Sequence, residues 1–173
     1  MSDRVYLDTS ALVSYALGLC GSPDARDQKG KQAIEGLLTS DDKLAASPIT
    51  LAEFSSVMYT YLRSSEGWLT QLGEADVDQA EADVMGRIAT GSIRVRNLGP
   101  RAFEMGMSYV GAISREYQRK MKAWDAIHLY EACRWARETD EQVVIATADS
   151  DFKGFLDVFP AFCKHVRVVN TTV

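Results

Sequence analysis

The sequence has few cysteines and histidines. Its three cysteines, Cys20, Cys133 and Cys163, are far apart, and no Cys-x-x-Cys pair occurs. This pattern argues against a disulfide framework or a zinc knuckle and favours a reducing, cytoplasmic compartment. The two histidines are His128 and His165. Such a small number weakens the case for a Ser-His-Asp triad or a His-rich zinc site.

Long apolar runs are also absent. No stretch of about 18 uncharged apolar residues occurs, so the sequence predicts no membrane span. The N-terminus lacks a basic segment followed by an apolar one, so it indicates no secretory signal. A length of 173 residues predicts one domain. The formal net charge of −5 argues against a general nucleic-acid coat, but not against a nuclease whose acids form a metal site.

Strand-like and helix-like segments alternate along the chain. Short apolar or alternating runs predict strands at 4–7, 43–47, 93–96, 142–146 and 165–169. Apolar stripes and capping residues predict helices at 9–18 (capped by Thr9 or Ser10), 27–39, 48–63, 73–90, 100–119 and 124–138. We therefore expect an α/β fold, a three-layer α/β/α sandwich with a central, mainly parallel sheet. It would form a single domain over 1–173, with a helical arm at about 63–90.

Four acids stand beside apolar segments at separate places in the chain: Asp8, Glu53, Asp125 and Asp149. Carboxylates avoid apolar surroundings unless they are paired or bind a metal. Four that converged would repel one another and raise their pKa values unless a cation neutralised them. A hard divalent cation with oxygen ligands would do so. A metal-dependent enzyme is therefore the first hypothesis.

Each acid also has an ordinary structural interpretation. Asp8 and Asp149 follow predicted strands, where ligand sites form in parallel sheets, but an aspartate there is also a common N-cap or turn residue. Glu53 could complete a capping box with Thr50, although Ser47-Pro48 already supplies a helix start. Glu53 and Asp125 lie on the apolar stripes of their helices, where an acid needs a partner. An internal salt bridge is the alternative to a site.

A basic run leads into Asp125. Its cations include Arg115, Arg119, Lys120 and Lys122. They predict either contacts with RNA phosphates beside the acids or a solvated helix end, where cations favour the helix dipole. Both interpretations stay open from the sequence.

The ordered motifs around the acids resemble a PIN domain, the fold typical of VapC-type toxins of bacterial and archaeal toxin–antitoxin systems. The resemblance covers essentially the whole chain and rests on Leu7–Leu12 (LDTSAL), Thr50–Phe54 (TLAEF), Trp124–Leu129 (WDAIHL) and Thr147–Phe152 (TADSDF). The four acidic positions of the family map onto Asp8, Glu53, Asp125 and Asp149. Its polar helper positions map onto Ser10 and Thr147. Asp151 is an extra acid, expected to be a helix N-cap, with a metal role as the alternative.

This resemblance implies an endoribonuclease that depends on Mg²⁺ or Mn²⁺ and cleaves single-stranded regions of RNA. Asp8, Asp125 and Asp149 would be metal ligands, and Glu53 would hold or orient the attacking water. It also implies a toxin role, an antitoxin protein as partner, and a homodimer. Two alternatives are a PIN-domain nuclease of RNA processing and a catalytically silent PIN-like interaction module.

Two further expectations follow from single positions. An aspartyl-phosphate phosphatase would need a second aspartate two places after Asp8. The chain has Ser10 there, which argues against this class of enzyme. Trp68 is a large apolar residue in a polar connecting segment. It predicts a contact of the 63–90 arm with a second chain, either a twin or an antitoxin, or else packing on its own core.

Overall fold

A single parallel sheet organises the fold. The structure, a computed structural model, describes residues 3–117, 122–149, 152, 156 and 164–173. The strands are β1 (Arg4–Leu7), β2 (Lys43–Ala46), β3 (Ile93–Val95), β4 (Val143–Thr147) and β5 (Val166–Asn170). They pair in the order β3-β2-β1-β4-β5, and every pairing is parallel. The expected mainly parallel sheet is confirmed.

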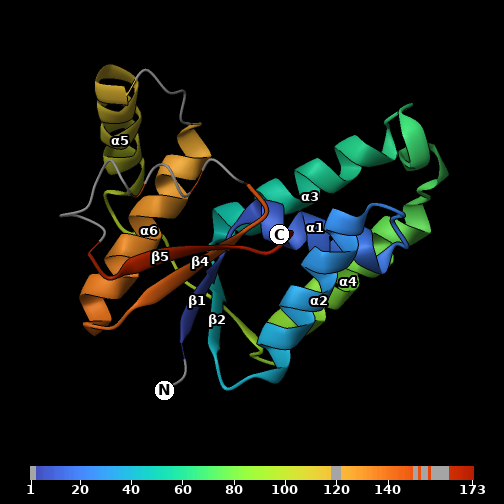
Figure 1. The fold of residues 1–173 in the computed structure, drawn as a ribbon, viewed down its shortest axis with the longest axis horizontal. Helices are drawn as coiled ribbons and strands as arrows, with labels where there is room; N and C mark the ends of the chain where they lie inside the picture. Colours follow the sequence, from blue (N-terminus) through green and yellow to red (C-terminus); the bar gives the residue numbers. More distant parts are fainter. Residues whose placement is uncertain (1–2, 118–121, 150–151, 153–155, 157–163) are drawn as a thin grey trace.

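Helices cover both faces of this sheet (Figure 1). One face carries α1 (Thr9–Leu19), α2 (Ala25–Thr39), α3 (Pro48–Leu62), the 3-10 helix η1 (Gly67–Gln71) and α4 (Glu74–Ala89). The other face carries α5 (Ala102–Tyr117) and α6 (Ala123–Thr139). The three-layer α/β/α arrangement expected from the sequence is therefore confirmed.

The strands β1, β2 and β4 each contribute to two separate cores, because successive side chains point to opposite faces of a sheet. In β1, Tyr6 packs with α5 and α6, whereas Val5 and Leu7 pack with α1. In β4, Ile145 packs in the core with α5 and α6, whereas Val144 packs in the core with α1. Burial on both faces explains why these strands are nearly continuous apolar runs.

The order of the strands places a site at one edge of the sheet. The chain moves from β1 to β2 on one side, and later inserts β4 on the other side of β1. The carboxyl ends of β1 and β4 therefore lie side by side at the point where the strand order reverses. In open parallel sheets, ligands bind at this point.

The N-cap of the first helix differs from expectation, and α2 and α5 begin about two residues away from their predicted starts. The N-cap of α1 is Asp8, not Thr9 or Ser10, because the Asp8 carboxylate accepts a hydrogen bond from the Ser10 backbone N–H at 3.3 Å. The N-cap of α3 is Ser47, which forms a capping box with Thr50. Glu53 is consequently in the second turn of α3 and takes no part in capping it.

The segment at 63–90 packs on the rest of the domain. In α4, Val77, Ala80 and Val84 are buried in the core that α1 and α3 also form. Trp68 is half-buried against the same core, which was the alternative to a contact with a second chain. A contact of its exposed part with another chain stays a prediction.

In the part of the chain that the structure describes, no helix combines the length and the apolar character needed to cross a membrane.

The close packing of α1 against α2 depends on Gly30. A methyl group on Gly30 would lie 2.8 Å from the Cβ of Ser14 and closer still to its Oγ. We expect Gly30→Ala to lower the free energy of unfolding by about 1–3 kcal/mol, because the helices must move apart. Urea unfolding of the purified protein measures this change.

Gly36→Ala is the matched control in the same helix. A methyl group there would meet nothing within 4 Å, so the change should stabilise the protein by roughly 0.5–1 kcal/mol through helix propensity. Equal effects of the two substitutions would contradict the close packing at Gly30.

Candidate active site

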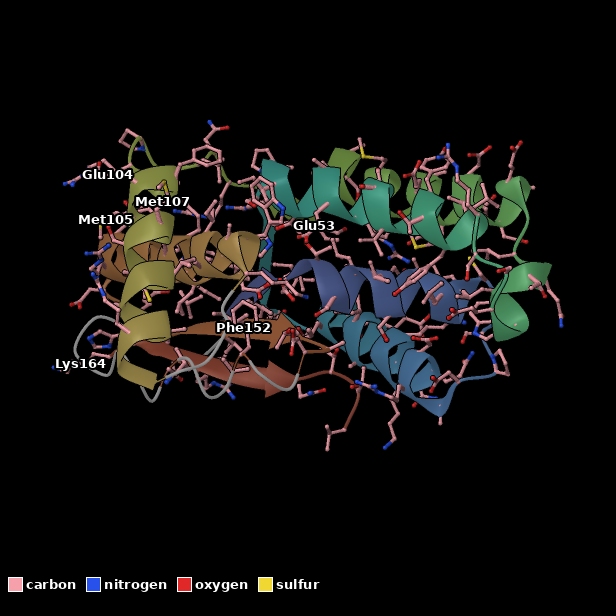
Figure 2. All side chains as sticks on the ribbon, turned by 90° about the horizontal axis from the view of Figure 1, so that it is seen from above. Glu53, Glu104, Met105, Met107, Phe152 and Lys164 are labelled. Atoms are coloured by element: carbon pink, nitrogen blue, oxygen red, sulfur yellow. The ribbon has the colours of Figure 1, made fainter. Side chains whose placement is uncertain are left out.

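One open groove brings the four acids together. Asp8 follows β1 and caps α1, Glu53 is in the second turn of α3, Asp125 is in the first turn of α6, and Asp149 follows β4. All four line the same groove, whose volume is about 430 Å³. Figure 2 shows Glu53 where the start of α3 approaches α6. The groove therefore lies at the carboxyl edge of the sheet.

Asp8 is the most firmly held of the four. Its side chain is only 5% exposed. Its Oδ2 accepts hydrogen bonds from the Ser10 hydroxyl at 2.6 Å and from the Thr147 hydroxyl at 3.0 Å. Both residues were predicted as polar helpers, and the structure places both hydroxyls on this carboxylate.

The same two hydroxyls hold the loop that carries Asp149. The backbone N–H of Ala148 donates to the Ser10 Oγ at 2.9 Å, and the N–H of Asp149 donates to the Thr147 Oγ1 at 3.0 Å. Further along the same motif, Phe152 is fully buried in the core beneath α5 and α6 (Figure 2). The segment after β4 is thus tied to the start of α1.

Glu53 is more accessible than Asp8, with 27% of its side chain exposed. Its Oε2 accepts a hydrogen bond from the Thr9 hydroxyl at 2.6 Å and lies 3.4 Å from the Nε2 of His128. The hydrogen bond with His128 lowers the pKa of Glu53, and Thr9 acts in the same direction, whereas burial opposes them. Glu53 is therefore ionised at neutral pH.

Asp125 has the opposite electrostatic environment. Burial raises its pKa to about 6, and repulsion from Asp8 and Asp149 adds to the shift. Lys122 and His128 partly offset it. Asp8 and Asp149 are close enough to Asp125 to affect its pKa, as expected for converging acids.

The donor set fits a hard divalent cation in its chemistry, because all four acids offer carboxylate oxygens. Among the residues that the structure describes, no three acids, histidines or cysteines are close enough together to hold a metal ion as they stand. Burial is the main cause of the raised pKa of Asp125, and repulsion from Asp8 and Asp149 adds to it; a bound cation would relieve that repulsion.

The predicted basic residues divide into three groups. Lys122 lines the groove. Arg115 is exposed in the last turn of α5 and is not part of the groove wall. Arg119 and Lys120, like the extra acid Asp151, lie outside the described residues.

The sequence did not identify several residues that line the groove or contact its acids. Arg26 lines the groove from the first turn of α2, and its guanidinium approaches the Ala148 carbonyl oxygen at 3.5 Å. Thr9 and His128 contact Glu53. The signal for His128 was its position three residues after Asp125, which places both side chains on one face of α6.

Comparisons with known proteins identify the fold. No protein-family model matches the chain, and no curated protein matches it in sequence. The crystal structure of VapC20 from Mycobacterium tuberculosis, a toxin that cleaves the sarcin–ricin loop, is similar, with a TM-score of 0.55. The chain has a PIN-like fold. The match covers 87% of this chain and 94% of that one at 20% identity, a level that shows the fold alone.

The raised pKa of Asp125 predicts a pH-dependent stability. Well below pH 4 the carboxyl group is protonated in both folded and unfolded chains, so burial carries little penalty. Between pH 4 and 6 it ionises more readily in the unfolded chain, and the folded protein loses stability. Asp125→Asn removes this loss. In EDTA at pH 7.5 we expect the variant to be about 1–3 kcal/mol more stable than wild type.

Urea unfolding of wild type and variant at pH 4 and pH 7.5 measures this difference. The gain should shrink toward zero at pH 4. A gain that is the same at both pH values would show that Asp125 is not held in a charge-repelling environment.

Proposed function

We propose that this protein is a metal-dependent endoribonuclease that cleaves single-stranded regions of RNA as the toxin of a toxin–antitoxin pair. The observation that supports this most directly is the convergence of four carboxylates, from four separate elements, in one open groove. The groove lies at the carboxyl edge of a parallel sheet with a PIN-like fold. A phosphodiester hydrolase needs this concentration of negative charge to hold its metal.

Asp8, Asp125 and Asp149 would hold a Mg²⁺ or Mn²⁺ ion. When bound, such an ion would neutralise charge at the scissile phosphate and activate water. Asp8 suits a fixed ligand, because Ser10 and Thr147 hold its carboxylate in one orientation. Asp125 would lose the repulsion that raises its pKa.

Glu53 would orient the attacking water and accept its proton. It is ionised, partly exposed to the groove, and anchored through a single oxygen, Oε2. These are the properties of a base that must reach solvent and still hold a fixed direction. Cleavage would add this water to phosphorus and break one phosphorus–oxygen bond of the RNA backbone.

The rest of the groove suits an unpaired strand. Arg26 and Lys122 place positive charge along its wall, where they can bind phosphates on either side of the scissile one. Val57 and Tyr61 of α3 also line it. Aromatic and apolar side chains favour unstacked bases, which single-stranded RNA offers and a duplex does not.

The toxin role is supported by the likeness to VapC20, a toxin that cleaves the sarcin–ricin loop. An antitoxin and a second copy of the chain are the partners that this role requires. On α5, Phe103 and Met107 are 56% and 76% exposed, one helical turn apart; Met107 is labelled in Figure 2. Large apolar side chains on one helix face suit a protein contact.

Substitution of Asp8 tests the nuclease. Asp8→Asn should abolish RNA cleavage in Mn²⁺ while the protein stays folded, because an amide oxygen can still accept from Ser10 and Thr147. Its melting temperature should rise less than that of wild type when Mn²⁺ is added, since the ion stabilises only a fold that binds it. Gel analysis of cleaved RNA and thermal unfolding measure the two effects.

Glu35→Gln is the control, because Glu35 is exposed on α2 and carries the same charge. It should match wild type in both measurements. Wild-type cleavage by Asp8→Asn at saturating Mn²⁺ would refute the assignment of the site.

The two groove cations predict a salt dependence of RNA binding. Arg26→Ala with Lys122→Ala should reduce the slope of log affinity against log salt by about 1.4, since each contact with a single strand releases roughly 0.7 of a counterion. Fluorescence anisotropy with a labelled single-stranded RNA, in the Asp8→Asn background without cleavage, measures the slope.

The matched control is Arg63→Ala with Lys164→Ala. Both residues are exposed and neither lines the groove, while the loss of charge is the same. If the two double variants gave the same slope, Arg26 and Lys122 would act only through net charge.

A further inference from the structure

His128 is fully buried in α6, yet its ring reaches the acids from inside the protein. Its Nε2 lies 3.4 Å from the Oε2 of Glu53, 3.4 Å from the Oγ1 of Thr9 and 3.6 Å from the Oδ1 of Asp8. Its Nδ1 lies 3.0 Å from the hydroxyl of Tyr6. Both ring nitrogens therefore have polar partners, and one of them faces the groove acids.

The partners of Nε2 determine where the hydrogen lies. Glu53 and Asp8 are carboxylates, which only accept hydrogen bonds when ionised. The Thr9 hydroxyl donates its own hydrogen to Glu53 at 2.6 Å, so its oxygen can only accept from His128. Three acceptors surround Nε2, and Nε2 must be the donor.

The partner of Nδ1 fixes the same arrangement from the other side. Burial raises the pKa of Tyr6 far above neutral pH, so its hydroxyl keeps a hydrogen to donate. Tyr6 can then donate to Nδ1, which leaves the imidazole hydrogen on Nε2.

The contacts of Glu53 are all on one side of its carboxylate. Among the described residues, its hydrogen bonds from Thr9 and His128 both go to Oε2. The Oε1 atom is left for the groove, which Glu53 lines. A histidine that served only to fill the core would not need to meet an acid that is partly exposed.

We propose that His128 is a positioning residue: its Nε2–H and the Thr9 hydroxyl anchor Oε2 of Glu53, and Tyr6 holds the ring, so that Oε1 faces the attacking water. This inference rests on the proposed nuclease function. The buried side of α6 would thus orient the base, Glu53. Partners behind a ligand or base commonly change activity by about 10- to 100-fold when they are removed.

Two substitutions of His128 separate positioning from packing. The amide nitrogen of glutamine reaches the place of Nε2, whereas that of asparagine reaches only the place of Nδ1. Both variants lose the ring, so both should lower the melting temperature. His128→Asn should lower kcat for RNA cleavage by about 10- to 100-fold at an unchanged KM, and His128→Gln should recover a substantial part of that loss.

Nuclear magnetic resonance of the metal-free protein gives a readout that does not need activity. The chain has two histidines, and His165→Gln assigns the exposed one. Two-bond proton–nitrogen spectra of wild type should show His128 with its hydrogen on Nε2 and a bare Nδ1. Tyr6→Phe should leave the hydrogen on Nε2, whose three acceptors remain, and should shift the Nδ1 resonance, which loses its hydrogen bond.

The outcomes separate the inference from the function on which it rests. If wild type cleaves RNA and the asparagine and glutamine variants have equal kcat, or if the hydrogen lies on Nδ1, the positioning role of His128 is wrong and the nuclease stands. If wild type does not cleave RNA in Mn²⁺, the proposed function fails and the positioning role fails with it. The inference is supported if kcat decreases from wild type to His128→Gln to His128→Asn and if the hydrogen of His128 lies on Nε2.

Discussion

The acidic groove depends on two hydroxyl groups that join the ends of β1 and β4. The Ser10 and Thr147 hydroxyls lie 2.9 Å apart, both donate to Asp8, and both accept from the backbone after β4. Hydrogen bonds to a charged group contribute about 1.5–3 kcal/mol each. They hold a buried carboxylate at the switch point of the sheet, and they bring Asp149 to it.

Around this fixed centre, the acids have different environments. Burial raises the pKa of Asp125, whereas a hydrogen bond from His128 lowers that of Glu53. Neighbouring carboxyl groups whose pKa values are pushed apart can take different chemical roles. The contrast supports Asp125 as the residue that gains from a cation and Glu53 as the one that stays free to take a proton.

Local patterns predicted the elements well, because short apolar runs and capping residues carry their own signals. The N-cap of α1 was mistaken, since Asp8, Thr9 and Ser10 are three adjacent residues that all favour this position. The order of the four motifs along the chain predicted that their acids would lie together. The contact between Tyr6 and His128 could not be predicted, because it joins residues 122 positions apart and a buried histidine leaves no periodic pattern. Arg26 was missed because its contact with Ala148 also joins residues 122 positions apart.

The pairing of β1 with β4 also determines when the groove can exist. Asp8 and the hydroxyl of Thr147 that holds it are 139 residues apart, and β4 must pair with β1 before they can meet. Contacts this distant in sequence form late in folding. A ribosome that has made the first three-quarters of the chain carries α1 through α5 without the last wall of the groove. Any activity of the groove would therefore begin only when synthesis of the chain is nearly complete.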